Sequence, residues 1–172
     1  MFVISLATSD LLFCSFNLPI IVSEYASHRA YQDWLHGTFM CRLYPFFFYG
    51  NCGASISNLC TITINRYVLI CHNGIYKKIF SGIKIALIIL FTWLFPFAIM
   101  SLPLFEIWGQ FGLWEDGNFC NTLEKDGHHP GLFIMVCAFG IPFITIIVCY
   151  SRIFLEVRKM RRELKVKHCN SL

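Results

Sequence analysis

The sequence predicts an all-α fold, a transmembrane helical bundle, and two observations lead to this class. Hydrophobic residues make up 56% of the 172 residues and charged residues only 14%, with a mean hydropathy of +0.60. Soluble domains carry about 25% charged residues. The second observation is a set of apolar segments of about 20 residues, each long enough to cross a hydrocarbon core of about 30 Å as a helix.

Four such spans are predicted, at residues 1–25, 43–64, 84–105 and 131–155. Helices are expected because backbone polar groups in lipid must form their hydrogen bonds within the segment. Residues 156–172 are basic and continue the helical pattern as a cytoplasmic extension. This extension is interpreted either as a solvated basic face or as a surface for anionic lipid or a signalling partner.

Basic residues set the orientation of the bundle. The stretches that follow the second and fourth spans hold most of them: Arg66, Lys77, Lys78, Lys84, Arg152, Arg158, Lys159, Arg161, Arg162, Lys165 and Lys167. The opposite loops hold only Arg29, Arg42 and Lys125. By the positive-inside rule, the loop after residue 64 and the C-terminal tail face the cytoplasm.

Asp10 is an ionisable residue inside the first span. It lies 15 residues before Tyr25 and therefore about 22 Å from the outer surface, where an unpartnered carboxylate is costly. Ser55 on the second span lies at a compatible depth. We expect the two to share a polar cavity that holds a cation such as sodium, with a protonated, hydrogen-bonded structural Asp10 as the alternative. Pro19 is expected to bend the outer part of the same span.

Two cysteines are placed in or beside the outer loops, Cys41 and Cys120. Because the outer compartment is oxidising, they are predicted to form a disulfide. Most of the other cysteines fall within the spans and are interpreted as small apolar core residues.

Trp93 in the third span and Pro142 in the fourth span are expected to have structural roles. The Trp93 indole N–H needs a hydrogen-bond partner, and Asn58 on the second span is a candidate. Pro142 is expected to bend the fourth span, and Tyr150 follows it by eight residues toward the cytoplasm.

Arg66 closes the second span within the triplet Asn65-Arg66-Tyr67. An arginine at the edge of an apolar segment is either a snorkelling anchor or a functional group. No phosphate-binding glycine loop, HExxH or GxSxG motif is present in the sequence, so an enzyme is not expected. Nothing indicates a nucleic-acid partner or a metal other than sodium.

These motifs together resemble those of the rhodopsin-like G-protein-coupled receptors. LAxxDLL matches at Asp10, the external WxxGxxxC at Trp34 and Cys41, and the DRY-type triplet at Asn65-Arg66-Tyr67, while the remaining matches are Trp93, Pro142 and Tyr150. The resemblance implies that residues 1–172 are a single partial receptor domain containing the second to fifth of seven helices. Within the family, the chain is most similar to the orphan invertebrate group of moody and trapped in endoderm, and it is related to melatonin receptors.

The resemblance also assigns roles to residues. The ligand pocket would be formed by Phe48, Tyr49, Cys52, Glu124 and Phe139. The G-protein site would be formed by Asn65, Arg66, Tyr67 and Tyr150, with an inhibitory G protein as partner. Sodium would be an allosteric modulator, and Trp34 would be structural.

Departures from the family pattern narrow the ligand. The aspartate that anchors amines in aminergic receptors falls at Phe48, and melatonin-contacting positions fall at Pro103, Glu124 and Ala138. An amine or melatonin is therefore not expected, and the extracellular ligand stays unknown. Asn65 replaces the usual aspartate and removes an ion pair to Arg66, which is expected to change basal activity.

The receptor would be a multi-pass protein of the plasma membrane, in contact with lipid. Two alternatives are a four-span transporter or channel subunit, with Asp10 as its ion site, and a truncated, non-signalling receptor.

Overall fold

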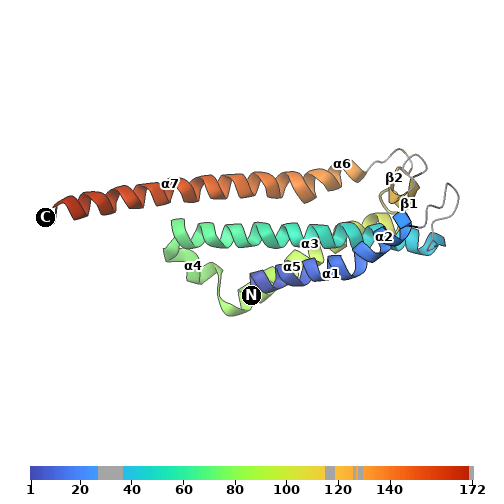
Figure 1. Cartoon of the computed structure of the whole chain (residues 1–172), viewed down its shortest axis with the longest axis horizontal. Coiled ribbons are helices and arrows are strands. Elements are labelled where there is room, and N and C mark those ends of the chain that lie inside the picture. Colours follow the sequence, from blue (N-terminus) through green and yellow to red (C-terminus); the bar gives the residue numbers. More distant parts are fainter. Residues whose placement is uncertain (27–36, 115–118, 126, 128–129, 171–172) are drawn as a thin grey trace.

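A computed structural model describes residues 1–26, 37–114, 119–125, 127 and 130–170 of the chain (Figure 1). The helices are α1 (Phe2–Leu12), α2 (Leu18–Ala26), α3 (Gly37–Cys71), α4 (Asn73–Ile79), α5 (Gly82–Leu104), α6 (Pro130–Met135) and α7 (Ile141–Asn170). Two strands, β1 (Gln110–Trp114) and β2 (Phe119–Leu123), form an antiparallel hairpin. The molecule is therefore a helical bundle, as predicted, with one hairpin that the sequence analysis did not anticipate.

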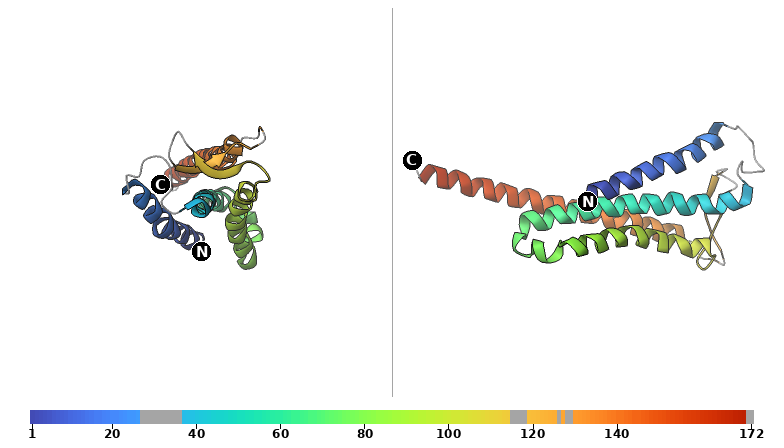
Figure 2. Two further views of the ribbon diagram at one scale, coloured as in Figure 1. Left: turned by 90° about the vertical axis from the view of Figure 1, so that its right-hand side faces the viewer. Right: turned by 90° about the horizontal axis from the view of Figure 1, so that it is seen from below.

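The long helices run side by side, with the hairpin at one end of the bundle and α4 at the other (Figure 1). Viewed from the hairpin end, α3 lies between the other helices (Figure 2). It contacts α1, α5, α7 and both strands. Beyond α4, α7 continues alone as one unbroken helix, so the predicted extension of residues 156–172 is helical through Asn170.

The central position of α3 explains its composition. Within the described residues, three helical stretches are long and apolar enough to cross a membrane, at Phe2–Ser23, Gly82–Leu104 and Pro130–Val166. Residues 43–64, expected to be apolar enough to span, do not meet that measure of hydropathy. Polar side chains on α3 are buried against neighbouring helices, as with Asn58 at 0% exposure, so polarity on this helix faces protein rather than lipid. At 35 residues, α3 is still about 52 Å long.

Two π-helical turns each end two residues before a proline. The first spans Phe13–Asn17 and precedes Pro19, and the second spans Val136–Gly140 and precedes Pro142. A proline ring displaces the carbonyl four residues earlier, and those positions, Ser15 and Ala138, fall inside the two turns. The irregularities expected from Pro19 and Pro142 are therefore found one turn before each proline.

Trp93 donates its indole N–H to Ser5 Oγ at 2.9 Å, not to Asn58. The prediction of Asn58 as its partner is wrong. Asn58 instead donates to the Ala54 carbonyl at 2.9 Å and accepts from Thr92 Oγ1 at 3.5 Å. Trp93 therefore joins α5 to α1, while Thr92 joins α5 to α3.

The hairpin is anchored to the bundle by an apolar side chain. Phe111 is only 3% exposed and packs in a small core with Met100 and Ile134. Gly109 leads the chain into β1 with a φ of +71°, in the left-handed region that favours glycine. A Cβ there would also lie 2.5 Å from the Pro130 ring, so this entry into the hairpin requires glycine.

Candidate functional site

The disulfide between Cys41 and Cys120 ties the hairpin to the top of α3. The Cα atoms are 5.3 Å apart, within the ordinary range of about 4.4–6.8 Å, and both residues are buried. Cys120 stands opposite Leu113 in the hairpin register. The pairing predicted from the sequence is present, and it fixes β2 over the outer end of the bundle.

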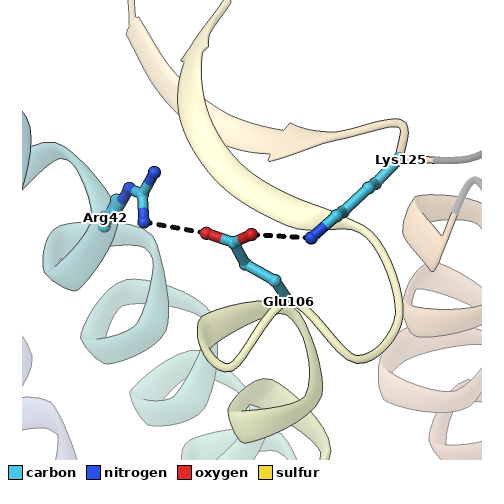
Figure 3. A network of polar contacts seen from close by, with 3 residues as sticks. All are labelled: Arg42, Glu106 and Lys125. Atoms are coloured by element: carbon cyan, nitrogen blue, oxygen red, sulfur yellow. Dashed lines mark hydrogen bonds and ion pairs between the residues drawn. The ribbon is translucent and has the colours of Figure 1, made fainter.

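A second link at the same end is ionic. Glu106 follows α5 and accepts from Arg42 Nη1 at 2.8 Å and from Lys125 Nζ at 2.6 Å, so one carboxylate joins α3, α5 and the segment after β2 (Figure 3). The hydrogen bond and charge of Lys125, with the charge of Arg42, lower the pKa of the Glu106 carboxyl. Glu106 also has a φ of 58°, which is uncommon for a residue with a Cβ.

A polar cluster joins α1 to α3, in which Ser9 and Asn51 are buried while the Asp10 side chain is exposed among the described residues. The Ser55 hydroxyl lies 3.0 Å from Asp10 Oδ1 and 2.8 Å from Ser9 Oγ. Asn51 Nδ2 donates to the Ser9 carbonyl at 3.1 Å. Asp10 and Ser55 are thus in contact, as their depths predicted. Their carboxylate and hydroxyl oxygens, with Ser9 Oγ, are hard donors of the kind that sodium takes.

A narrow cavity of about 40 Å³ lies between α3, α5 and the π-turn before α7. Three of the five expected pocket residues line it, namely Tyr49, Cys52 and Phe139. Phe48 lies outside this lining and packs in an aromatic row with Phe13, Tyr44 and Tyr49. Glu124 is exposed and also lies outside it.

Tyr49 connects this cavity to the hairpin, because its hydroxyl donates to Asn121 Oδ1 at 2.7 Å.

Trp34 lies outside the described residues, so its expected structural role stays a prediction.

At the opposite end, each residue of the triplet has a different environment. Asn65 Nδ2 donates to the Tyr76 hydroxyl at 3.3 Å, which binds α3 to α4. The Tyr67 hydroxyl lies 3.1 Å from His72 Nε2. Arg66 is exposed and has no ion pair or side-chain hydrogen bond within the described part of the chain. Tyr150 on α7 is 52% exposed, and no hydrogen bond joins it to Arg66 within the described residues.

The sequence analysis did not anticipate two features of the structure, the ion-pair network at the outer end and the hairpin. The Arg42–Glu106–Lys125 network joins three segments, and its formation depends on where the hairpin folds. The hairpin itself has a signal in the sequence, since Asp116-Gly117 separates two short runs rich in aromatic and other apolar residues.

The structure is a helical bundle with helices able to cross a membrane, a hairpin held by a disulfide at one end and, within the described residues, an arginine without an ion pair at the other, an arrangement that fits a membrane receptor. The family model "7 transmembrane receptor (rhodopsin family)" matches residues 1–171. The chain therefore belongs to the rhodopsin family of seven-transmembrane receptors.

Known proteins agree with this assignment. The chain is 37% identical to "Protein trapped in endoderm-1" of Drosophila melanogaster, over 95% of this chain and 41% of that protein. It is 39% identical to "G-protein coupled receptor moody" of the same species, over 95% of this chain and 24% of that protein. The crystal structure of squid rhodopsin matches with a TM-score of 0.78 at 25% identity, covering 98% of this chain and 45% of the other.

The chain thus spans less than half the length of the curated relatives it matches. The predicted resemblance to the moody and trapped in endoderm group is confirmed. Neither alternative, a transporter or channel subunit or a non-signalling receptor, is supported by these comparisons.

Proposed function

We propose that this chain forms the second to fifth helices of a G-protein-coupled receptor in the plasma membrane, which responds to an extracellular ligand and activates an intracellular heterotrimeric G protein. The observation that carries this proposal is the exposure of Arg66 and its lack of a charged partner within the described residues. Its guanidinium is exposed at the end of the bundle opposite the disulfide and has no charged partner within the described residues.

An unpaired arginine suits the docking of a partner. Its planar fork makes several hydrogen bonds at once, so it can bind backbone carbonyls or a carboxylate of a docked protein. Tyr150 is exposed on α7, eight residues beyond Pro142 toward the cytoplasmic end, and its hydroxyl can both donate and accept a hydrogen bond. In the active arrangement, Arg66 approaches the Tyr150 hydroxyl and the docked G protein, and an inhibitory G protein is the expected type.

The ligand end has a different chemistry. The lining of the narrow cavity is apolar apart from Tyr49, Ser57 and the two thiols of Cys52 and Cys137, and it contains no carboxylate. An uncharged or weakly polar ligand therefore fits better than an amine. Because a cavity of about 40 Å³ has room for little more than one water molecule, ligand entry requires α3, α5 and α7 to separate.

A chimeric receptor tests the proposal. Residues 1–172 replace the matching segment of Drosophila trapped in endoderm-1, and guanine nucleotide exchange is measured in membranes with purified heterotrimers of the inhibitory and stimulatory classes. We expect ligand-independent exchange above that of receptor-free membranes, faster on the inhibitory heterotrimer. Arg66→Ala should return exchange to background without changing the amount of receptor at the surface.

Lys84→Ala is the matched control, because Lys84 is another exposed basic residue at the cytoplasmic end. Exchange should be retained in that variant. A chimera that reaches the surface but leaves exchange at background would refute the proposed function. Full exchange by Arg66→Ala would reduce Arg66 to an anchor at the membrane surface.

A further inference from the structure

The cytoplasmic part of α7 has a basic side. It carries four exposed cations, namely Arg158, Arg161, Arg162 and Lys165. Residues three, four and seven positions apart lie on one side of an α-helix, so the four form a single stripe, called the basic face below. α7 is one unbroken helix through this region, and it projects past α4 (Figure 1).

The basic face points away from the bundle. The side of α7 that packs on the bundle carries Cys149, which is buried, and Ile153 and Val157, which are half-buried. At 3.6 residues per turn, this side lies about 130° around the helix from the centre of the basic face. Both acidic residues of the extension, Glu156 and Glu163, lie opposite the basic face as well. Charges of the two signs are therefore separated on this helix.

The four cations of the basic face have no carboxylate partner in the part of the chain that the structure describes. A solvated helix surface commonly mixes the two signs, so that neighbouring turns pair. Four like charges within eight residues instead repel one another, and an anionic surface relieves that repulsion.

The basic face continues a strip of apolar side chains on the membrane-spanning part of α7. Phe143, Ile147 and Phe154 in this strip are 65%, 49% and 55% exposed. They lie on the same side as the basic face, because the intervals from Phe143 through to Arg158 are four, seven and four residues. Exposed apolar side chains on a spanning helix face lipid. The lipid-facing side of α7 therefore changes from apolar to basic where the predicted span ends, at residue 155.

Arg158 joins the apolar strip to the basic face. Its guanidinium carbon lies 4.4 Å from the centre of the Phe154 ring, as a cation over an aromatic face. Phe154 is one turn nearer the membrane, so the Arg158 side chain extends back toward the bilayer along an apolar surface. This contact places a cation beside the last aromatic side chain of the strip, at the level where the phosphates of the inner leaflet begin.

The other cations lie close enough to attract headgroups. At 1.5 Å per residue, Arg162 is about 12 Å beyond Phe154 along the helix axis, and Lys165 is about 16 Å beyond it. The headgroup zone is about 5–8 Å thick, and charge attraction extends about 8–10 Å further at physiological salt. A headgroup that stands out from the surface and carries several phosphates therefore meets more of the basic face than a single phosphodiester does.

We propose that the basic face binds anionic lipid of the inner leaflet, with a preference for a headgroup that carries several phosphates. The arginines bind the phosphates through their planar forks, and the acyl chains pack on Phe154 and Ile147. Lipid binding here needs neither a G protein nor an extracellular ligand. The inference thus goes beyond the proposed function, and its failure would leave that function standing.

Native mass spectrometry of the whole chain tests the proposal. Each ligand is titrated onto the chain in detergent micelles, and the bound fraction is measured. Three ligands are lipids with identical acyl chains: a phosphatidylinositol bisphosphate, phosphatidylserine and phosphatidylcholine. The fourth is inositol trisphosphate, which presents the phosphates of the first lipid without its acyl chains.

We expect the bisphosphate lipid to bind at least about tenfold more tightly than phosphatidylcholine, with phosphatidylserine between them. Inositol trisphosphate should bind at least about tenfold more weakly than the bisphosphate lipid, because it makes no contact with the apolar strip. Replacing all four residues of the basic face by glutamine should lower the affinity for the bisphosphate lipid about tenfold.

The matched control removes four positive charges at the same end of the bundle but off the basic face. Its substitutions, all at exposed positions, are Lys77→Gln, Lys78→Gln, Lys84→Gln and Lys159→Gln. This variant should lose less than about threefold in affinity for the bisphosphate lipid. Formation of the Cys41–Cys120 disulfide reports folding in both variants.

Equal binding of the bisphosphate lipid and phosphatidylcholine by the unchanged chain would overturn the proposal, and this comparison needs no variant. An equal loss in the two fourfold variants would also overturn it, since total charge rather than the basic face would then attract the lipid. Inositol trisphosphate that binds as tightly as the lipid would replace the membrane by a soluble phosphate as the partner.

Discussion

Asn65 donates a hydrogen bond from Nδ2 to the Tyr76 hydroxyl at 3.3 Å, so the residue before Arg66 is bound to the short helix α4. The cytoplasmic end of α3 is thus joined to its following loop by a neutral contact. In the family pattern an aspartate stands at this position and pairs with the arginine. Here the loop contact is made while Arg66 keeps no charged partner within the described residues.

Asn65→Asp should lower the basal activity of the chimeric receptor about two- to fivefold. An aspartate oxygen can still accept a hydrogen bond from Tyr76, so the loop contact is kept and only the charge is added. A partly exposed ion pair with Arg66 contributes about 0.3–1 kcal/mol to the inactive arrangement. Nucleotide exchange without ligand measures the effect.

Asn73→Asp is the control for this experiment, because it adds the same charge at an exposed position of α4. Basal exchange should not fall in that variant. An increase or no change with Asn65→Asp would show that the charge at position 65 does not restrain Arg66.

Glu106 should make the outer end of the bundle sensitive to acid. Its pKa is lowered in the folded state by Lys125 and Arg42, so its contribution to stability is complete above the ordinary value of 4.5. That contribution is lost as the pH falls from 4.5 through the lower folded-state pKa. Hydrogen exchange of the β1–β2 amides, corrected for the intrinsic pH dependence, should show reduced protection below about pH 4.5.

Glu106→Gln removes the titrating group and should abolish this loss of protection, while lowering protection at neutral pH. Glu163→Gln, on the cytoplasmic part of α7, is the matched control and should leave the hairpin unchanged. The same acid-dependent loss in Glu106→Gln would assign it to another group.

Contacts between residues at the same depth in the membrane were predicted from the sequence. Contacts that depend on which way a helix is rotated about its axis were predicted less well. Cys41 and Cys120 were paired because both lie on the outer side, and Asp10 and Ser55 because their distances from the surfaces agree. Both pairs are in contact. For Trp93, Asn58 was the candidate partner, and the rotation of α1 places Ser5 there instead.

The contribution of the hairpin was also missed, for a different reason. Five-residue strands are short, and the apolar flanks of the second outer loop can be read as part of the spans. The pairing is stabilised by contacts distant in sequence, namely the disulfide and the burial of Phe111 against Met100.

Removing the disulfide should destabilise the chain more than removing any free cysteine. Cys41 and Cys120 are 79 residues apart, and the chain-entropy model gives about 4–5 kcal/mol for closing a loop of that size. We expect Cys41→Ala combined with Cys120→Ala to lower the free energy of unfolding by this order, measured by denaturant titration in detergent micelles.

Cys14→Ala is the control, since Cys14 is free and exposed. It should change the free energy of unfolding by less than about 0.5 kcal/mol. Equal stability of the double variant and the unchanged chain would mean that the hairpin is held by Glu106 and Phe111 without the disulfide.

Asp10 should make basal activity depend on sodium. The Ser55 hydroxyl of α3 lies between two oxygens of α1. It is 3.0 Å from the Asp10 carboxylate and 2.8 Å from the Ser9 hydroxyl. A sodium ion bound there ties the two helices in the present arrangement, and a ligand that binds one state shifts the equilibrium toward it. Exchange by the chimeric receptor should therefore be slower in sodium chloride than in potassium chloride of equal ionic strength.

Asp10→Asn should remove this difference, because the amide lacks the negative charge that attracts the cation. Ser55→Ala should reduce it, since one oxygen is lost while the carboxylate stays. Glu106→Gln, which neutralises a carboxylate at the outer end, should leave the sodium dependence unchanged. If Asp10→Asn retains the full difference between the two salts, sodium acts elsewhere, and the contact between Asp10 and Ser55 is a structural hydrogen bond between α1 and α3.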